Sequence, residues 1–137
     1  MPGPTPALNA IIVCDTLIKD RDSNKRSLIG IFTHLAAPSF PAVHARLSIF
    51  ARVIDAEGNY AIRIELVRLA TMQIIGEGEA EVAIQDRLRY HELTFILNGL
   101  RFPAAGRYEF RLYADGVFLG HQAFEVTGPD TEQAQQG

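Results

Sequence analysis

The sequence contains one cysteine and no tryptophan among its 137 residues. Cys14 cannot form a disulfide within the chain, although small secreted sandwich domains commonly carry one. We therefore expect a reducing compartment and a cytoplasmic protein. Without tryptophan, and with most phenylalanines and tyrosines on predicted core faces, the sequence shows no obvious aromatic platform for sugars.

Long apolar runs and basic clusters are also missing. No stretch approaches the roughly 18 apolar residues of a membrane span, and the start of the chain lacks the positive charge of a signal sequence. The 13 basic and 16 acidic residues give a net charge of −3 and are spread along the chain. A nucleic-acid footprint needs a basic face. We expect neither nucleic acid nor membrane as a partner.

Clustered catalytic groups are absent as well. The histidines at 34, 44, 91 and 121 include no pair at the short spacings of a metal site. No serine lies in a nucleophile-elbow sequence, and Gly76-Glu-Gly78 is not followed by the Lys-Ser/Thr of a phosphate loop. The sequence therefore predicts no enzyme, no cofactor and no metal.

One acidic segment imitates a calcium loop. Asp20-Arg-Asp22-Ser-Asn24 has the spacing of the first three EF-hand ligands, but Lys25 occupies the glycine position and Ile31 the position of the bidentate glutamate. A polar turn, in which these side chains bond their own backbone, is the favoured interpretation.

The regular feature of the chain is short alternating segments separated by turn residues. In the closing segment Tyr108, Phe110 and Leu112 alternate with charged residues, and Asp115-Gly116 supplies a tight turn. This pattern predicts an all-β, immunoglobulin-like antiparallel β-sandwich of about eight strands, with a jelly-roll order left open. The predicted strands are 8–18, 27–35, 44–54, 60–69, 73–84, 91–102, 107–114 and 117–126.

Length and composition predict one domain. Three prolines in residues 1–6 indicate a disordered lead-in, residues 7–127 form the sandwich, and residues 128–137 form a flexible polar tail. The apolar fraction of 47% has two explanations. Either the sandwich core is well filled, or one face is hidden in a partner.

The first predicted strand is apolar on both faces around Ile12 and Val13. A central strand gives this pattern, and so does an edge that pairs across an oligomer interface. Asp15 interrupts the strand, and we expect it to accept hydrogen bonds from a neighbouring loop, such as the turn at 22–26.

The segment at 73–84 places three glutamates on one face and two glycines on the other. We expect Glu77, Glu79 and Glu81 to pair with Arg63 or Arg68 on a neighbouring strand. The glycines predict a bulge or a close backbone approach.

Several sequence features together resemble a family of small bacterial proteins of unknown function. They are Cys14-Asp15, Ser27-Leu-Ile-Gly-Ile-Phe32, Phe40-Pro41 and the closing Gly-x-Tyr-x-Phe-x-Leu-Tyr-x-Asp-Gly. The resemblance covers roughly residues 7 to 127. It implies an immunoglobulin-like sandwich and brings no catalytic residues. The disulfide and core tryptophan of true immunoglobulin domains are missing, while Tyr108 fits a tyrosine-corner position.

The function predicted from these features is a non-enzymatic structural or protein-interaction module that forms homo-oligomers. Its partner is a second copy or another protein, bound through Ile12 and Val13. The alternative is a small-ligand or carbohydrate-binding sandwich that uses its end loops. That site would lie around Phe40 and His44, or in the turn at 55–59.

Overall fold

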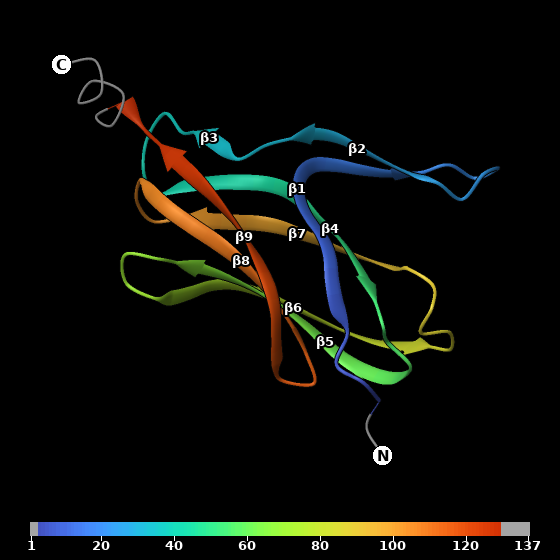
Figure 1. The fold of residues 1–137 in the computed structure, drawn as a ribbon. Helices are drawn as coiled ribbons and strands as arrows, with labels where there is room; N and C mark the ends of the chain where they lie inside the picture. The colour runs from blue at the N-terminus through green and yellow to red at the C-terminus, as the bar shows by residue number, and fades with distance from the viewer. Residues whose placement is uncertain (1–2, 130–137) are drawn as a thin grey trace.

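A computed structural model describes residues 3–129, which form nine strands in two facing sheets (Figure 1). One sheet has the order β2-β1-β4-β7 and the other β3-β9-β8-β5-β6. No helix in the described part of the chain is long and apolar enough to span a membrane. The strand bounds are β1 Ala7–Lys19, β2 Arg26–Ile31, β3 His34–Ala36, β4 Ala42–Ile54, β5 Gly58–Arg68, β6 Gln73–Ile84, β7 His91–Phe102, β8 Gly106–Ala114 and β9 Val117–Thr127.

The predicted sandwich is confirmed, with nine strands where about eight were expected. The additional strand arises because the predicted segment 27–35 divides into β2 and β3. Between them the chain crosses from the four-stranded to the five-stranded sheet, where β3 pairs in parallel with β9. Side chains alternate with a period of two in β2 and in β3 alike. The sequence pattern therefore does not show that the chain changes sheets between them.

The strand order is immunoglobulin-like. By position, β1, β4 and β7 match strands A, B and E, whereas β5, β8 and β9 match C, F and G. Tyr108 lies near the start of the F-like strand, and its hydroxyl donates a hydrogen bond of 2.6 Å to the Ala104 carbonyl four residues upstream. This is the arrangement of a tyrosine corner. The predicted role of Tyr108 is therefore confirmed.

An aromatic cluster fills the end of the core near the crossing. Phe124 of β9 is 3% exposed, and its ring lies 5.6–6.0 Å from four other rings, centroid to centroid. These rings belong to Phe32, Phe102, Tyr108 and Phe110. Phe32 lies in the connection after β2, Phe102 in β7 of the four-stranded sheet, and the other two rings in β8 of the five-stranded sheet, so Phe124 contacts rings from both sheets.

Residues at both described ends contact the sandwich. The Tyr60 hydroxyl donates to the Pro4 carbonyl at 2.6 Å, and Pro6 is buried. Pro4 and Pro6 therefore have defined contacts with the sandwich. At the other end Gly128 lies against the Phe40 ring, where a Cβ atom would overlap that ring. Most of the predicted tail, residues 130–137, and residues 1–2 lie outside the described residues.

Strand β6 shows both features that its glycines predicted. Its pairing with β5 shifts by one residue between Leu66 and Val67, which marks a bulge. A Cβ atom on Gly76 would lie 2.7 Å from Leu100 Cδ2, so the opposite sheet approaches closely there. On the outward face, Arg63 bonds Glu77 and lies 3.1 Å from Glu79. The expected pairing with Arg63 is confirmed for Glu77 and Glu79, whereas Glu81 lies opposite Ala61.

Candidate functional site

The end of β1 and all of β2 form a hairpin that continues beyond the part of β1 paired with β4 (Figure 1). We call residues 15–31 the arm. Strand β1 pairs with β4 as far as Cys14 and with β2 from Cys14 onwards, so the arm begins where β4 pairing ends. Strand β2 is the edge of its sheet, and its far side has no neighbouring strand among residues 3–129.

The tip of the arm is the polar turn expected from sequence. The Asp20 carboxylate accepts hydrogen bonds from the Asp22 amide at 3.1 Å and the Ser23 hydroxyl at 2.9 Å. The bond from the Asp22 amide is the main cause that lowers the pKa of Asp20. Asn24 closes the turn with a φ of 60°. Both carboxylate oxygens of Asp20 therefore accept hydrogen bonds from within the turn.

Three residues of the four-stranded sheet are buried although they face away from the sandwich core. Cross-strand partners share a face, so Cys14 lies with Ser48, and the next pair on the same face includes Phe50. Val13, the neighbour of Cys14, faces the core instead. Cys14 and Ser48 are 0% exposed and Phe50 is 5% exposed. Something other than the five-stranded sheet must therefore cover this outer face.

The arm provides that cover. Arg26 at the start of β2 contacts Glu92 of β7. In the sheet order, β1 and β4 lie between these two strands. Arg52 of β4 joins the same carboxylate at 3.6 Å, and its guanidinium lies 5.5 Å from the centre of the Phe50 ring. Because Arg26 reaches Glu92 across the sheet, we infer that the arm folds over the outer face and buries Cys14.

Releasing the arm is expected to expose Cys14. Burial raises the pKa of its thiol, with a smaller contribution from the Asp15 charge, so little reactive thiolate forms in the folded protein. Arg26→Ala removes the contact with Glu92, which at this partly exposed position contributes up to about 1 kcal/mol. We expect the rate of Cys14 alkylation to rise roughly two- to fivefold. Iodoacetamide labelling followed by mass spectrometry measures it.

Arg89→Ala is the control for that experiment. Arg89 lies 3.4 Å from Asp86 in an exposed turn and does not contact the arm. Its replacement should leave the labelling rate unchanged. An Arg26→Ala protein that reacts no faster than wild type would show that the arm does not gate Cys14.

The solvent side of the arm carries a row of exposed isoleucines. Ile18, Ile29 and Ile31 are 47%, 51% and 60% exposed. The pairs Ile18–Ser27, Thr16–Ile29 and Cys14–Ile31 place the three isoleucines on one face of the hairpin. Of the other three edge strands, β3 has only three residues, β6 carries the glutamate row, and β7 is a long strand of 12 residues. A very short strand and a row of charged side chains both protect a sheet edge from pairing with another chain, whereas the arm has an apolar face.

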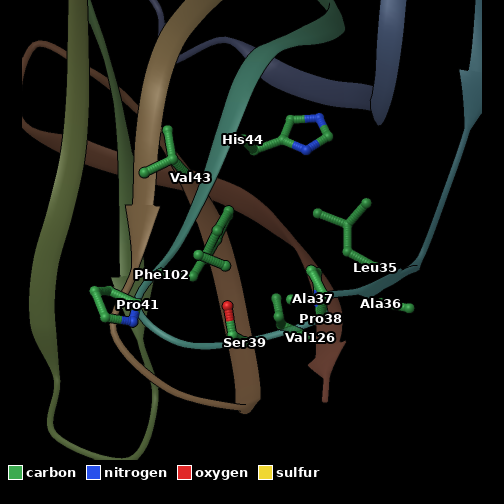
Figure 2. Close-up of a pocket in the computed structure, with 11 residues that line it drawn as sticks. Leu35, Ala36, Ala37, Pro38, Ser39, Pro41, Val43, His44, Phe102 and Val126 are labelled. Atoms are coloured by element: carbon green, nitrogen blue, oxygen red, sulfur yellow. The ribbon is translucent and has the colours of Figure 1, made fainter. Parts of the chain in front are cut away.

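A pocket of about 290 Å³ opens between β3 and the beginning of β4 (Figure 2). We call it the crossover pocket. The buried side chains of Phe102 and Val126 line it from the core side, and prolines 38 and 41 stiffen the connection that crosses it. It is lined by Leu35, Ala36, Ala37, Pro38, Ser39, Pro41, Ala42, Val43, His44, Phe102 and Val126.

His44 is the one ionisable side chain in that lining. Its ring lies 6.1 Å from the Phe32 ring, centroid to centroid, and its Nε2 lies 3.4 Å from Asp15 Oδ1. Nε2 is enclosed and has no hydrogen-bond partner among residues 3–129. Asp15 itself is half exposed and lies beside Gly30 and His44. The expectation that the turn at 22–26 would bond Asp15 is therefore wrong.

The four residues predicted to contact a partner or ligand lie in different surroundings. Val13 is 1% exposed and belongs to the core, so a partner does not reach its side chain in the folded protein. Ile12 is half-buried on the outer face of the sheet. His44 lines the crossover pocket. Phe40 lies outside that pocket, against Gly128, and lines a neighbouring hollow of about 610 Å³.

The arm isoleucines and Asp15 were not singled out as a surface from sequence. The segment 26–31 alternates only weakly, because the apolar Leu28 directly precedes Ile29. The available signal was the polar turn at 20–25 between two apolar segments, which indicates a hairpin. Where the hairpin separates from β4 depends on where the pairing between β1 and β4 ends. The described residues contain no cluster of three or more histidine, cysteine or acidic side chains suited to a metal ion.

Comparison with solved structures finds distant likenesses of fold. An immunoglobulin-like protein (PA1606) from Pseudomonas aeruginosa is 8% identical, with a TM-score of 0.45, over 90% of this chain and 98% of that chain. The CARDB domain of the PF1109 protein from Pyrococcus furiosus, solved with di-metal ions, is 10% identical. Its TM-score is 0.42, over 93% of this chain and 92% of that chain.

No curated protein matches the sequence. A family model does match, over residues 9–127, and its family is described as one of unknown function. The match spans nearly all of the sandwich, from β1 to the end of β9. The chain therefore belongs to the family of unknown function DUF6941.

Proposed function

We propose that this domain is a non-catalytic protein-interaction module that uses the arm as its contact surface. The observation that carries the proposal is the row of exposed isoleucines 18, 29 and 31 on one face of an edge hairpin. Each is about half exposed or more, although isoleucine is among the residues most often buried. Their removal from water by a partner would be favourable.

The backbone of β2 supports the same proposal. An edge strand has unpaired N–H and C=O groups that can continue the sheet with a strand from another chain. Strand β2 extends over six residues, Arg26–Ile31, which is long enough for several such hydrogen bonds. The structure thus offers a polar edge for pairing beside an apolar face for burial.

A second copy of this chain is the partner we favour. Two β2 strands that pair antiparallel about Ile29 would place Ser27 opposite Ile31 of the other copy, on the same face. The two isoleucine rows would then form one apolar strip. Arg26 would not carry uncompensated charge into this interface, because it already contacts Glu92. The resulting assembly is a two-fold symmetric homodimer.

The test is the oligomeric state of a double variant, Ile29→Lys with Ile31→Lys. We expect wild type to sediment as a dimer and the variant as a monomer with an unchanged circular dichroism spectrum. Leu88→Lys is the matched control, since Leu88 is 81% exposed in a turn outside the arm. Sedimentation velocity over a range of concentrations measures the change. A wild type that stays monomeric, or a double variant that stays dimeric, would refute the proposal.

A further inference from the structure

The crossover pocket carries a second inference, which does not depend on the exposed isoleucines of the arm. Its volume of about 290 Å³ is at the lower end of the roughly 300–1,000 Å³ of small-molecule sites. Most of its lining is apolar, and the polar side chains in it are those of Ser39 and His44. Apolar walls with few polar groups are the usual composition of a ligand site. The volume limits the ligand to a small molecule, such as one with a single ring.

Asp15 determines which hydrogen bond His44 can offer to such a ligand. An ionised carboxylate only accepts hydrogen bonds, and Asp15 Oδ1 lies 3.4 Å from Nε2 of His44. No hydrogen bond joins these two groups, but the negative charge of the nearby carboxylate favours the neutral imidazole that carries its proton on Nε2. In that tautomer the other nitrogen, Nδ1, is an acceptor. Figure 2 shows this nitrogen on the side of the ring that faces Leu35.

His44 is also held in place by its surroundings. Its ring is in aromatic contact with Phe32, with an interplanar angle of 56°, and 27% of its side chain is exposed. Nε2 is on the enclosed side of the ring. The accessible part of the ring is thus the part that includes Nδ1. A ligand in the pocket would meet an oriented acceptor above an apolar floor.

We propose that the crossover pocket binds a small, largely apolar molecule with one hydroxyl or N–H donor, which bonds to Nδ1 of His44. The ring or alkyl part of the ligand would lie against Phe102 and Val126. Asp15 is a positioning residue, because it fixes the tautomer without touching the ligand. The ligand class is a neutral phenol, alcohol or amide rather than an anion, since Asp15 lies behind the histidine.

Phenol and anisole are the probes for this proposal. Both have a ring of the right size, but anisole has a methyl group in place of the hydroxyl hydrogen. We expect phenol to shift the methyl NMR signals of Leu35, Val43 and Val126 in a saturable manner. One neutral hydrogen bond contributes about 0.5–1.5 kcal/mol, so anisole should bind roughly two- to tenfold more weakly.

Two variants separate the hydrogen bond from the shape of the pocket. His44→Phe keeps a ring beside Phe32 but removes the acceptor, so phenol and anisole should bind it equally. His121→Phe is the matched control, because His121 lies on β9, is half exposed and is not in the pocket lining. It should keep the preference for phenol.

The histidine nitrogen shifts provide a readout that needs no ligand. ¹⁵N NMR of the wild type should report the Nε2–H tautomer for His44. The Nδ1–H tautomer would overturn the proposal. So would the absence of a saturable phenol shift, equal affinities of wild type for phenol and anisole, or a phenol preference that persists in His44→Phe.

Discussion

Val13→Glu is expected to prevent folding, although the sequence alone presents Val13 as a possible contact residue. The side chain is 1% exposed and lies in the core cluster with Ile49 and Phe95 of the neighbouring strands. An ionised carboxylate buried without a partner costs several kcal/mol, which is a large share of the roughly 5–15 kcal/mol that stabilises a domain. Circular dichroism of the purified variant should show the loss of strand signal.

Val43→Glu is the control for Val13→Glu. Val43 is 66% exposed at the start of β4, so its carboxylate would stay in water and the fold should be kept. Ile12→Glu tests the opposite face of β1, where the side chain is half-buried beside Phe50. It should destabilise less than Val13→Glu. A folded Val13→Glu protein with native thermal stability would contradict the assignment of this strand's inner face.

Phe124→Ala is expected to lower the free energy of unfolding by about 3–5 kcal/mol. The large effect arises because Phe124 lies at the centre of the aromatic cluster, with Phe102 and Tyr108 edge-on or stacked against it. Its removal leaves a cavity that rings from several strands cannot all close. Urea denaturation followed by circular dichroism measures the change, provided that both proteins unfold in one step.

Phe118→Ala is the matched control on the same strand. Phe118 is 50% exposed and contacts Tyr113 at 5.7 Å, centroid to centroid, on the outer face of the sheet. Its loss should cost about 1 kcal/mol or less. If both phenylalanine variants lost similar stability, the aromatic cluster would not be the principal link between the sheets.

The two proposed surfaces, the arm and the crossover pocket, follow one another along the chain. The chain leaves β2 in the arm, crosses at Phe32 to β3, and then lines the crossover pocket before β4 begins. Asp15 belongs to the arm and His44 to the pocket, and the two side chains meet. The variants Ile29→Lys and His44→Phe therefore test the surfaces separately, since neither residue lies in the other site.

The sequence by itself determined the fold class and most strand positions. Period-two alternation depends only on neighbouring residues, as in Tyr108, Phe110 and Leu112 of β8, and turn residues mark the ends of strands. The same local information identified the tyrosine corner and the turn at 20–25. His44 was placed in a ligand site because loops at the end of a sandwich commonly bind ligands.

Only the tertiary structure decided which apolar residues are exposed. Val13 and Ile29 are both aliphatic strand residues, yet one is in the core and the other is half exposed. The difference depends on where β1 stops pairing with β4 and where the chain changes sheets. Those are contacts between distant segments, which a period of two does not encode. The meeting of Asp15 with His44 has the same origin, since 28 intervening residues must first fold into the arm and the crossing.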